Sequence, residues 1–475
     1  MVTEVFNPKK RVNSLYGFAQ MSFRNYLFLD VTARNDWSSA LTLPVNYATL
    51  GITDNSYFYP SASLSALVSE MLTLPKWISY GKVRLSAARG GNDTSPYAFT
   101  QAYNKQNPIG SNPVFNTSGV LRNYNIKPEI STSLEGGLEW KFLDNRLGFD
   151  FSYYHMNTKN QILNNVPVSI TSGWDTQILN AGEIRNSGIE MTLNTTPVKN
   201  AFRWDFDINF SMNRSKVIKL TDDISVYQMA GKEAISIEAR VGNRMGDMYG
   251  EVYQRVKDPS SPYYGQVINN ANGRPLSTGT RELLGNYNPD WLAGVRNTFS
   301  YKGVNFSFLF DIRHGGKVYS LTQVVGREAG QLEETLLGRA DGYDLSVAGN
   351  GVISPGVIQN ADGSFRPNDV VLTARAWNSA FTNGRSIAEP ATYSASFIKL
   401  REVTLGYSIP SKFLQKFNIT NMSLSLVGRN LWLHSKVPHI DPEQVAMDGG
   451  TYVPGVESSS IPTTRSVGLN LKFNF

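Results

Sequence analysis

The chain has 475 residues, and its 45 Lys and Arg against 39 Asp and Glu give a net charge of +6, too mild to indicate a nucleic-acid partner. It contains no Cys, which excludes disulfide scaffolds and cysteine nucleophiles, and its four His leave little room for a His-rich metal centre. The 40 Gly, 23 Tyr and 24 Phe are typical of strands and turns rather than helical bundles. No run of about 18 apolar residues occurs, so no transmembrane helix is predicted, and the first residues lack the apolar core of an export signal.

Apolar and polar residues alternate with a period of two along the chain, which predicts β-strands. Phe306, Phe308 and Phe310, for example, alternate with Asn305 and Ser307. Strands of roughly ten residues can cross a bilayer when they are tilted. The predicted strands cover 13–23, 26–36, 57–69, 80–90, 131–142, 146–157, 183–195, 202–216, 290–301, 304–313, 395–409, 420–434 and 464–475.

The two faces of these strands differ in charge. The apolar face carries no Asp, Glu, Lys or Arg, whereas the opposite face carries residues such as Arg84, Asp150 and Asp311. A charge that faces lipid near the middle of the bilayer costs about 2–4 kcal/mol, which explains the difference. A soluble sandwich, whose inner face is also apolar, is the alternative interpretation.

The links between the strands favour the membrane interpretation. They alternate between tight turns, such as 24–25 and 302–303, and long loops rich in Gly, Asn and Pro. Outer-membrane barrels have short periplasmic turns and long external loops, so the predicted fold is all-β, an antiparallel transmembrane β-barrel of the outer-membrane type. Inside the long loops, the sequence predicts an extra hairpin over 233–256 and a short helix over 328–340.

The number of strands also bears on domain organisation. Single-chain bacterial barrels have an even number of strands, and about thirteen are visible here. We therefore expect residues 1–475 to be the C-terminal portion of a larger barrel.

Several segments, in order along the chain, resemble the barrel of SusC/RagA-type TonB-linked outer-membrane proteins. They include NYLFLDVTARNDWSS (25–39), SYGKVRLSAARGGNDTSPY (79–97), SFIKLREVTLGYSIP (396–410) and GRNLW (428–432). The resemblance implies a transporter in the outer membrane of a Gram-negative bacterium that imports oligomeric nutrients such as glycans or peptides. It also implies a barrel of roughly 22 strands with a plugged lumen, whose plug domain and signal peptide would precede residues 1–475. A SusD-like surface lipoprotein is implied as a lid, and energy from TonB, ExbB and ExbD through the missing N-terminal part.

The resemblance further implies a role for the end of the chain. A terminal strand with C-terminal aromatic residues is a signal for the barrel-assembly machinery in outer-membrane proteins, and Phe473 and Phe475 fit it. The alternative is that both are ordinary lipid-facing residues, and the two interpretations are compatible.

Aromatic residues in the long loops are the candidate contacts for substrate or lid. Rings there could stack on sugars, although they could also simply pack the loops. The candidates are Tyr97, Tyr103, Trp174, Tyr264 and Trp377.

No feature of the sequence indicates an enzyme. Asp205 and Asp207 share one strand face, but a wet barrel interior would not raise the pKa of one carboxyl group as glycoside hydrolysis requires. HExxH, GxSxG and P-loop motifs do not occur, and no metal or cofactor is expected. The competing function from another class is a secreted, β-rich glycan-binding or adhesive protein.

Overall fold

The structure is a computed structural model that describes residues 9–42, 55–98, 101, 103–221, 224–341, 344–414, 419–444, 446–448 and 451–474. The chain divides into two compact units. The first covers 1–199, 204–227 and 240–245, and the second covers 200–203, 228–239 and 246–475. Among the described residues, no helix is both long enough and apolar enough to span a membrane.

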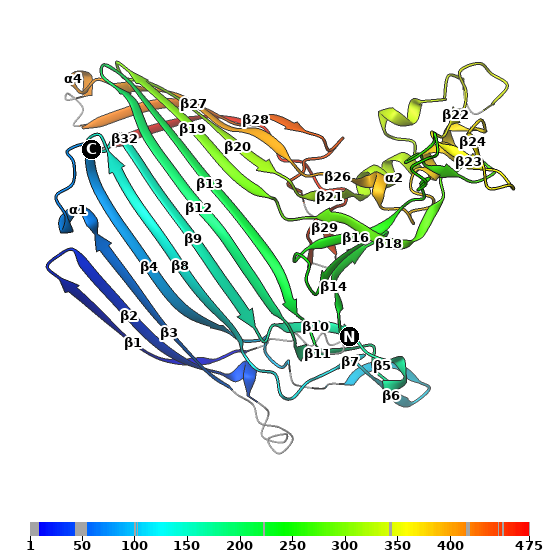
Figure 1. Ribbon diagram of the computed structural model, residues 1–475, viewed down its shortest axis with the longest axis horizontal. Helices are drawn as coiled ribbons and strands as arrows, with labels where there is room; N and C mark the ends of the chain where they lie inside the picture. Colours follow the sequence, from blue (N-terminus) through cyan, green and yellow to red (C-terminus); the bar gives the residue numbers. More distant parts are fainter. Residues whose placement is uncertain are drawn as a thin grey trace. The chain divides into compact units, whose positions relative to one another are not determined.

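The first unit is built on long antiparallel strands that pair in chain order (Figure 1). The long strands are β1 (Val12–Phe23), β2 (Leu27–Ser38), β3 (Ser56–Leu67), β4 (Ile78–Asn92), β8 (Glu129–Phe142), β9 (Leu147–Lys159), β12 (Glu183–Lys199) and β13 (Phe202–Lys219). The short elements between them are η1 (Ser39–Leu41), α1 (Val68–Met71), β5 (Tyr103–Ile109), β6 (Asn112–Thr117), β7 (Val120–Leu121), β10 (Ile162–Pro167), η3 (Ile170–Ser172) and β11 (Thr176–Asn180).

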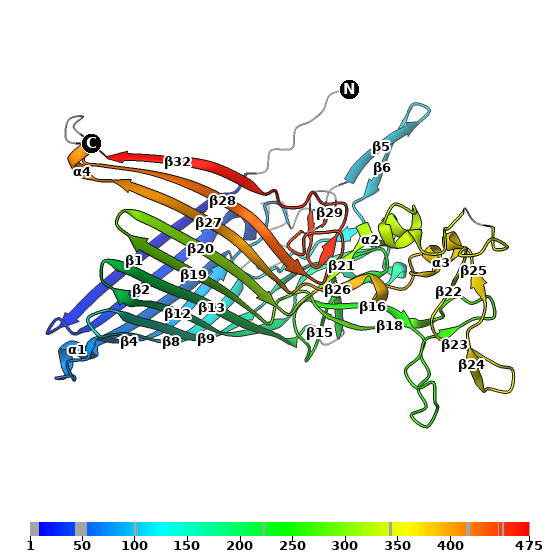
Figure 2. The ribbon, with the colours of Figure 1, turned by 90° about the horizontal axis from the view of Figure 1, so that it is seen from above.

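The second unit contains five further long antiparallel strands, which also follow chain order (Figure 2). They are β19 (Trp291–Tyr301), β20 (Val304–His314), β27 (Phe397–Ile409), β28 (Asn421–Ser435) and β32 (Ser466–Asn474). The remaining elements are β14 (Val226–Lys232), β15 (Ile235–Arg240), β16 (Asp247–Tyr253), β17 (Ile268–Asn269), β18 (Ser277–Asn286), β21 (Lys317–Ser320), α2 (Leu321–Glu328), η4 (Glu333–Leu336), β22 (Val352–Ile353), β23 (Val357–Gln359), β24 (Phe365–Pro367), β25 (Val371–Leu372), α3 (Ala374–Ala380), η5 (Glu389–Ala391), β26 (Thr392–Ser394), α4 (Ser411–Leu414), β29 (Ala446–Asp448), β30 (Thr451–Val453) and β31 (Val456–Glu457).

The predicted long strands are confirmed, and most begin and end within three residues of the predicted bounds. The predicted hairpin over 233–256 is present as β15 and β16, in which Ser236 pairs with Tyr249. It belongs to a four-stranded loop sheet of β14, β15, β16 and β18, which the sequence did not indicate.

The predicted helix over 328–340 is wrong. The helix of this loop, α2, ends where that prediction begins, and only the short η4 lies within the predicted range. Ser320 begins α2 by accepting a hydrogen bond from the backbone N–H of Gln323 at 3.1 Å. Gly330 then adopts a φ of +68°, a left-handed conformation that separates α2 from η4.

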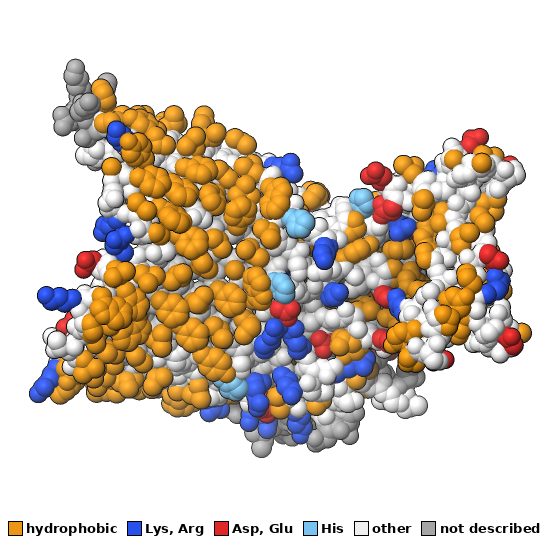
Figure 3. Space-filling model, turned by 45° about the horizontal axis from the view of Figure 1, so that its top comes forward, with side chains coloured by type: hydrophobic (Ala, Val, Ile, Leu, Met, Phe, Trp, Pro, Cys, Tyr) orange, Lys and Arg blue, Asp and Glu red, His pale blue; other side chains and the backbone are white. Residues whose placement is uncertain are grey.

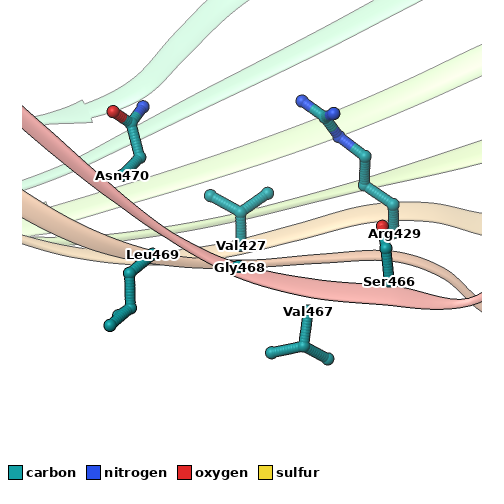
Figure 4. Close-up of a pocket in the computed structure, with 7 residues that line it drawn as sticks. All are labelled: Val427, Arg429, Ser466, Val467, Gly468, Leu469 and Asn470. Atoms are coloured by element: carbon teal, nitrogen blue, oxygen red, sulfur yellow. The ribbon is translucent and has the colours of Figure 1, made fainter.

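The apolar faces of the long strands are exposed in both units. Leu85 is 58% exposed in the first unit, and Leu405 and Leu469 are 50% and 75% exposed in the second. Figure 3 shows hydrophobic side chains crowded over the long strands. Figure 4 shows the alternation directly, with Val467 and Leu469 on one side of β32 and Arg429 and Asn470 on the other. An apolar surface of this extent marks contact with another apolar phase, because soluble monomers rarely expose one.

Gly188 permits close packing within the first unit and supports a testable prediction. It pairs with Tyr154 across β9 and β12, and the Tyr154 ring lies over it. A methyl group at Gly188 would contact the Tyr154 hydroxyl and lie 2.5 Å from the carbonyl oxygen of Met212. We expect Gly188→Ala to lower the free energy of unfolding by about 1–3 kcal/mol, because extra volume in a packed site forces side chains and backbone to shift.

The matched control is Gly17→Ala, because nothing lies within 4 Å of a methyl group at Gly17. Urea unfolding of the purified protein in detergent measures both variants. Equal destabilisation by the two substitutions would contradict the packing assigned to Gly188.

Candidate functional site

The polar face of the first unit carries an ion pair that reaches from β4 across β8 to β9. On β4, Arg84 donates hydrogen bonds from Nη1 and Nη2 to the two carboxylate oxygens of Asp150 on β9, at 2.9 and 2.6 Å. Its Nη2 also donates to the hydroxyl of Ser152 at 2.8 Å. Two parallel bonds hold the guanidinium in one orientation. Polar side chains on this face are therefore ordered but remain accessible to water.

Asp205 and Asp207, the carboxylates considered for hydrolysis, lie on the same kind of polar surface in β13. Asp205 accepts a hydrogen bond from the Thr196 hydroxyl at 2.7 Å, and Asp207 accepts one from the Asn194 amide at 2.7 Å. Both partners lie on the neighbouring strand β12. These hydrogen bonds join β13 to β12, as expected for side chains that line the wall of a barrel.

The second unit contains a denser charge network, which connects β27 to the loop before β32. The Lys399 ammonium donates to the Asp441 carboxylate at 2.7 Å and also contacts Glu443. The side chains of Lys399 and Asp441 are only 2% and 3% exposed. Arg401 joins Glu443 through Nη2 at 2.7 Å and Asp311 of β20 through Nε at 3.0 Å. We call Asp311, Lys399, Arg401, Asp441 and Glu443 the loop network.

A bulge in β27 explains how Lys399 and Arg401 come to this position. Against β20 the register shifts at this point, because Phe310 pairs with Leu400 and Leu309 pairs with Glu402, which leaves Arg401 as an extra residue of β27. The bulge adds a residue to the alternation, so the apolar series Ile398 and Leu400 continues at Val403 rather than at residue 402. The loop network was not predicted from the sequence. The adjacent polar pair Arg401-Glu402 inside an alternating strand was its only signal.

The charges of the loop network set the pKa of its loop carboxylates. Burial alone would raise the pKa of Asp441, but hydrogen bonds from Lys399, Thr463 and the backbone N–H of Glu443 lower it. The pKa of Glu443 is lowered in the same way, as the bonds from Arg401 and Lys399 exceed the effect of burial. Both carboxylates therefore stay ionised in the folded protein at pH values where they would be partly protonated in an unfolded chain.

The lowered pKa values of Asp441 and Glu443 predict that the loop before β32 detaches from β27 in acid. A carboxyl group with a lowered pKa in the folded state stabilises above its ordinary pKa, and the stabilisation is lost as the pH falls. We expect the loop before β32 to become mobile below about pH 4. The chain has no Cys, so a single introduced cysteine can be labelled specifically. Ile461 lies in this loop and is 84% exposed, so a spin label on Ile461→Cys reports the motion by electron paramagnetic resonance.

A spin label on Ile353→Cys serves as the control, because this residue lies in another loop of the second unit and is also exposed. Its mobility should not change over the same pH range. Equal responses at both labels would mean that acid loosens the loops in general rather than breaking the loop network.

A hydrophobic core packs several loop elements of the second unit against one another. Its buried members come from β15, β16, β21, α2, η5, β29, β30 and β31, and Ile237, Met248, Tyr319 and Val456 are all 0% exposed. The buried Glu457 carboxylate adds polar contacts, since it accepts hydrogen bonds from the hydroxyl groups of Ser320 at 2.9 Å and Thr322 at 2.6 Å. These loops therefore form one packed assembly.

The predicted contact residues occupy different environments. Tyr97 (50% exposed) follows β4, Tyr103 (71%) begins β5 and Tyr264 (61%) lies in a turn between β16 and β17. Trp174 is half-buried in the turn before β11, and Trp377 is half-buried on α3. Tyr97, Tyr103 and Trp174 belong to the first unit, and Tyr264 and Trp377 to the second. Their role in contacting substrate or lid stays a prediction.

The predicted assembly signal lies at the end of β32. Phe473 pairs with Met422 of β28 and is 46% exposed, on the same face as Val467, Leu469 and Leu471. Phe475 lies outside the described residues. The signal role stays a prediction.

Within the described ranges, no group of three or more His, Asp or Glu side chains is arranged to hold a metal ion.

Comparison with known proteins places these features in a family. The family described as TonB dependent receptor-like, beta-barrel matches residues 3–345. TonB-dependent receptor P3 of Formosa agariphila is 26% identical, over 97% of this chain and 45% of the relative. TonB-dependent receptor SusC of Bacteroides thetaiotaomicron is 24% identical, over 97% of this chain and 43% of the relative. The chain thus spans about half the length of the curated relatives it matches.

A solved structure shares the fold. The structure described as the RagAB peptide transporter matches with a TM-score of 0.72 and 19% identity. The match covers 97% of this chain and 48% of that one. This likeness supports the antiparallel barrel architecture deduced from the strands.

Proposed function

Because the chain belongs to the TonB dependent receptor-like, beta-barrel family of the outer membrane, we propose that it forms part of the wall of an importer for oligomeric nutrients such as glycans or peptides. The observation that carries this proposal is the difference between the two strand faces. Leu405 is exposed on the apolar face, whereas on the other face Glu402 pairs with Arg429 at 3.2 Å and Arg296 at 3.6 Å. The apolar face suits lipid and the charged face suits a hydrated passage.

The proposed mechanism is passage rather than a reaction. A wall of paired charges offers cargo many weak contacts, which let it leave as well as enter. The packed loop assembly of the second unit would present a fixed surface to arriving cargo. No step of this mechanism requires a bond to be made or broken.

We also propose that residues 1–475 are the C-terminal portion of a barrel of roughly 22 strands. Support comes from the outermost strands of each unit. Strand β1 pairs with β2 and strand β32 pairs with β28, and every described residue of β1 and β32 is exposed. Strand edges in a bilayer must be paired, because unsatisfied backbone groups are costly in hydrocarbon. Further strands would complete the wall at these edges.

The partners are inferred from similar proteins. The relatives include SusC, and the RagAB structure is described as a peptide transporter. We infer a SusD-like surface lipoprotein as a lid over the loops, and coupling to TonB, ExbB and ExbD through a preceding plug. Insertion would depend on the barrel-assembly machinery.

The membrane part of this proposal is tested by detergent partition and by gel mobility. The protein should enter the detergent phase, and its mobility in SDS gels should change on boiling. Recovery in the aqueous phase with unchanged mobility would instead favour the secreted glycan-binding or adhesive protein. The transport part is tested by uptake of fluorescent oligosaccharides and peptides in cells with and without the complete gene, and equal uptake would contradict it.

A further inference from the structure

A polar cavity of about 270 Å³ lies among the loop elements of the second unit. Its walls come from α2, η4 and α3 and the segments that follow α2 and η4. We call it the arginine pocket, and its polar lining is Arg327, Glu328, Thr335, Arg339, Arg375 and Asn378. Three arginines around one small cavity concentrate positive charge where water is partly excluded, so a bound anion would be held more strongly than at an open surface.

Arg327 is held in place by aromatic rings. Its guanidinium carbon lies 3.9 Å from the centre of the Phe381 ring and 6.0 Å from that of Trp377. Its Nε donates to the Asn378 side-chain oxygen at 3.2 Å. Neither Nη atom makes a hydrogen bond or ion pair with the described residues, so both remain available. Burial lowers the pKa of Arg327, and the nearby Glu334 carboxylate offsets this effect only in part.

The arginine pocket has more positive than negative side chains in its lining, which contains three arginines and one glutamate. Glu328 is already engaged by Arg385, whose Nη2 lies 2.7 Å from its carboxylate. Arg375 is exposed and makes no hydrogen bond or ion pair in the part of the chain that the structure describes. Arg339 reaches the carbonyl oxygen of Gly330 through Nη1 at 3.5 Å. Arg327 is half-buried and forms no ion pair with the described residues, and Glu334 acts on it only at longer range. An anion bound beside Arg327 would offset the cost of burying its charge.

We propose that the arginine pocket binds a carboxylate group carried by the cargo. Guanidinium groups match carboxylates through paired, charge-assisted hydrogen bonds, and Arg327 and Arg375 supply them from two different helices. The proposal rests on the proposed import function and narrows its cargo to acidic oligomers. Two sources carry the required group, uronic acids in a glycan and acidic residues or the C-terminus in a peptide.

Calorimetric titration of the purified protein in detergent tests the pocket. The probes are trigalacturonate for the glycan source, a tri-aspartate peptide for the peptide source and neutral maltotriose. We expect at least one acidic probe to bind, and Arg375→Gln to weaken its binding about tenfold, as for other charged hydrogen bonds. Binding of the acidic probe should also weaken with added salt. Whichever acidic probe binds more tightly identifies the source.

The matched control is Arg366→Gln, which removes one positive charge from the same long loop at a residue that pairs with Asp369 rather than lining the pocket. A second variant, Arg327→Lys, keeps the positive charge but loses the two parallel N–H donors of the guanidinium, and it should also weaken binding. The proposal is overturned if no acidic probe binds, if Arg375→Gln binds as tightly as the parent, or if Arg366→Gln causes an equal loss. The partition and uptake assays test the proposed import function independently, so its failure can be told apart from failure of the carboxylate proposal.

Discussion

Phe308→Arg is expected to abolish most assembly of the protein into the outer membrane. Phe308 lies near the middle of β20, on the face that we assign to lipid, where its ring centre is 5.7 Å from that of Phe310. A lipid-facing arginine at this depth costs about 2–4 kcal/mol. Folded protein is measured as the fraction in the outer membrane whose gel mobility changes on boiling.

Ser307→Arg is the matched control, because Ser307 precedes Phe308 and faces the opposite side of the strand. The same charge placed there meets water and other polar groups, so assembly should remain close to the parent level. If both substitutions impaired assembly equally, the assignment of the two faces would be wrong, and the membrane interpretation with it.

Lys399→Met should destabilise the protein by about 3–5 kcal/mol, the cost of breaking a buried ion pair by removing one partner. The substitution keeps most of the side-chain volume but leaves the Asp441 carboxylate, 3% exposed, without its ammonium partner. Glu443 loses a contact at the same time. Urea unfolding in detergent gives the change in free energy. The label on Ile461→Cys should already be mobile at pH 7 in this variant.

Lys141→Met provides the comparison. Lys141 pairs with Glu139 at 3.1 Å, but its side chain is 42% exposed, and pairs of this kind contribute about 0–1 kcal/mol. A second comparison is Lys399→Met combined with Asp441→Leu, which removes both charges and should recover part of the loss. Similar effects of the two single lysine substitutions would show that the loop network contributes little.

The long strands were predictable because the rule that forms them is local. A strand with lipid on one side and water on the other must alternate at every position, so β20 could be located from Val304 to Arg313 without any knowledge of its neighbours. The resemblance to the SusC/RagA-type family added the order of the segments and agrees with the match to residues 3–345.

Elements inside the loops were less predictable. The helix α2 begins at a Ser320 cap that could have been recognised, yet the prediction placed a helix after it, over apolar residues such as Leu336 and Leu337 that prove to be exposed. Short loop helices depend on their packing partners more than on their own propensity. The alternation rule does not apply to the loops, because no bilayer orders their side chains.

The sequence alone was sufficient for the strand pattern, the polarity of the two faces and the family. Only the tertiary structure revealed the loop network and the arginine pocket. Lys399 and Asp441 are 42 residues apart, and Arg327 and Arg375 are 48 residues apart, on different helices. Periodicity reports which face a residue occupies relative to its close neighbours. Contacts between distant charges depend on where loops of many residues come to rest, which only the packing of the whole unit determines.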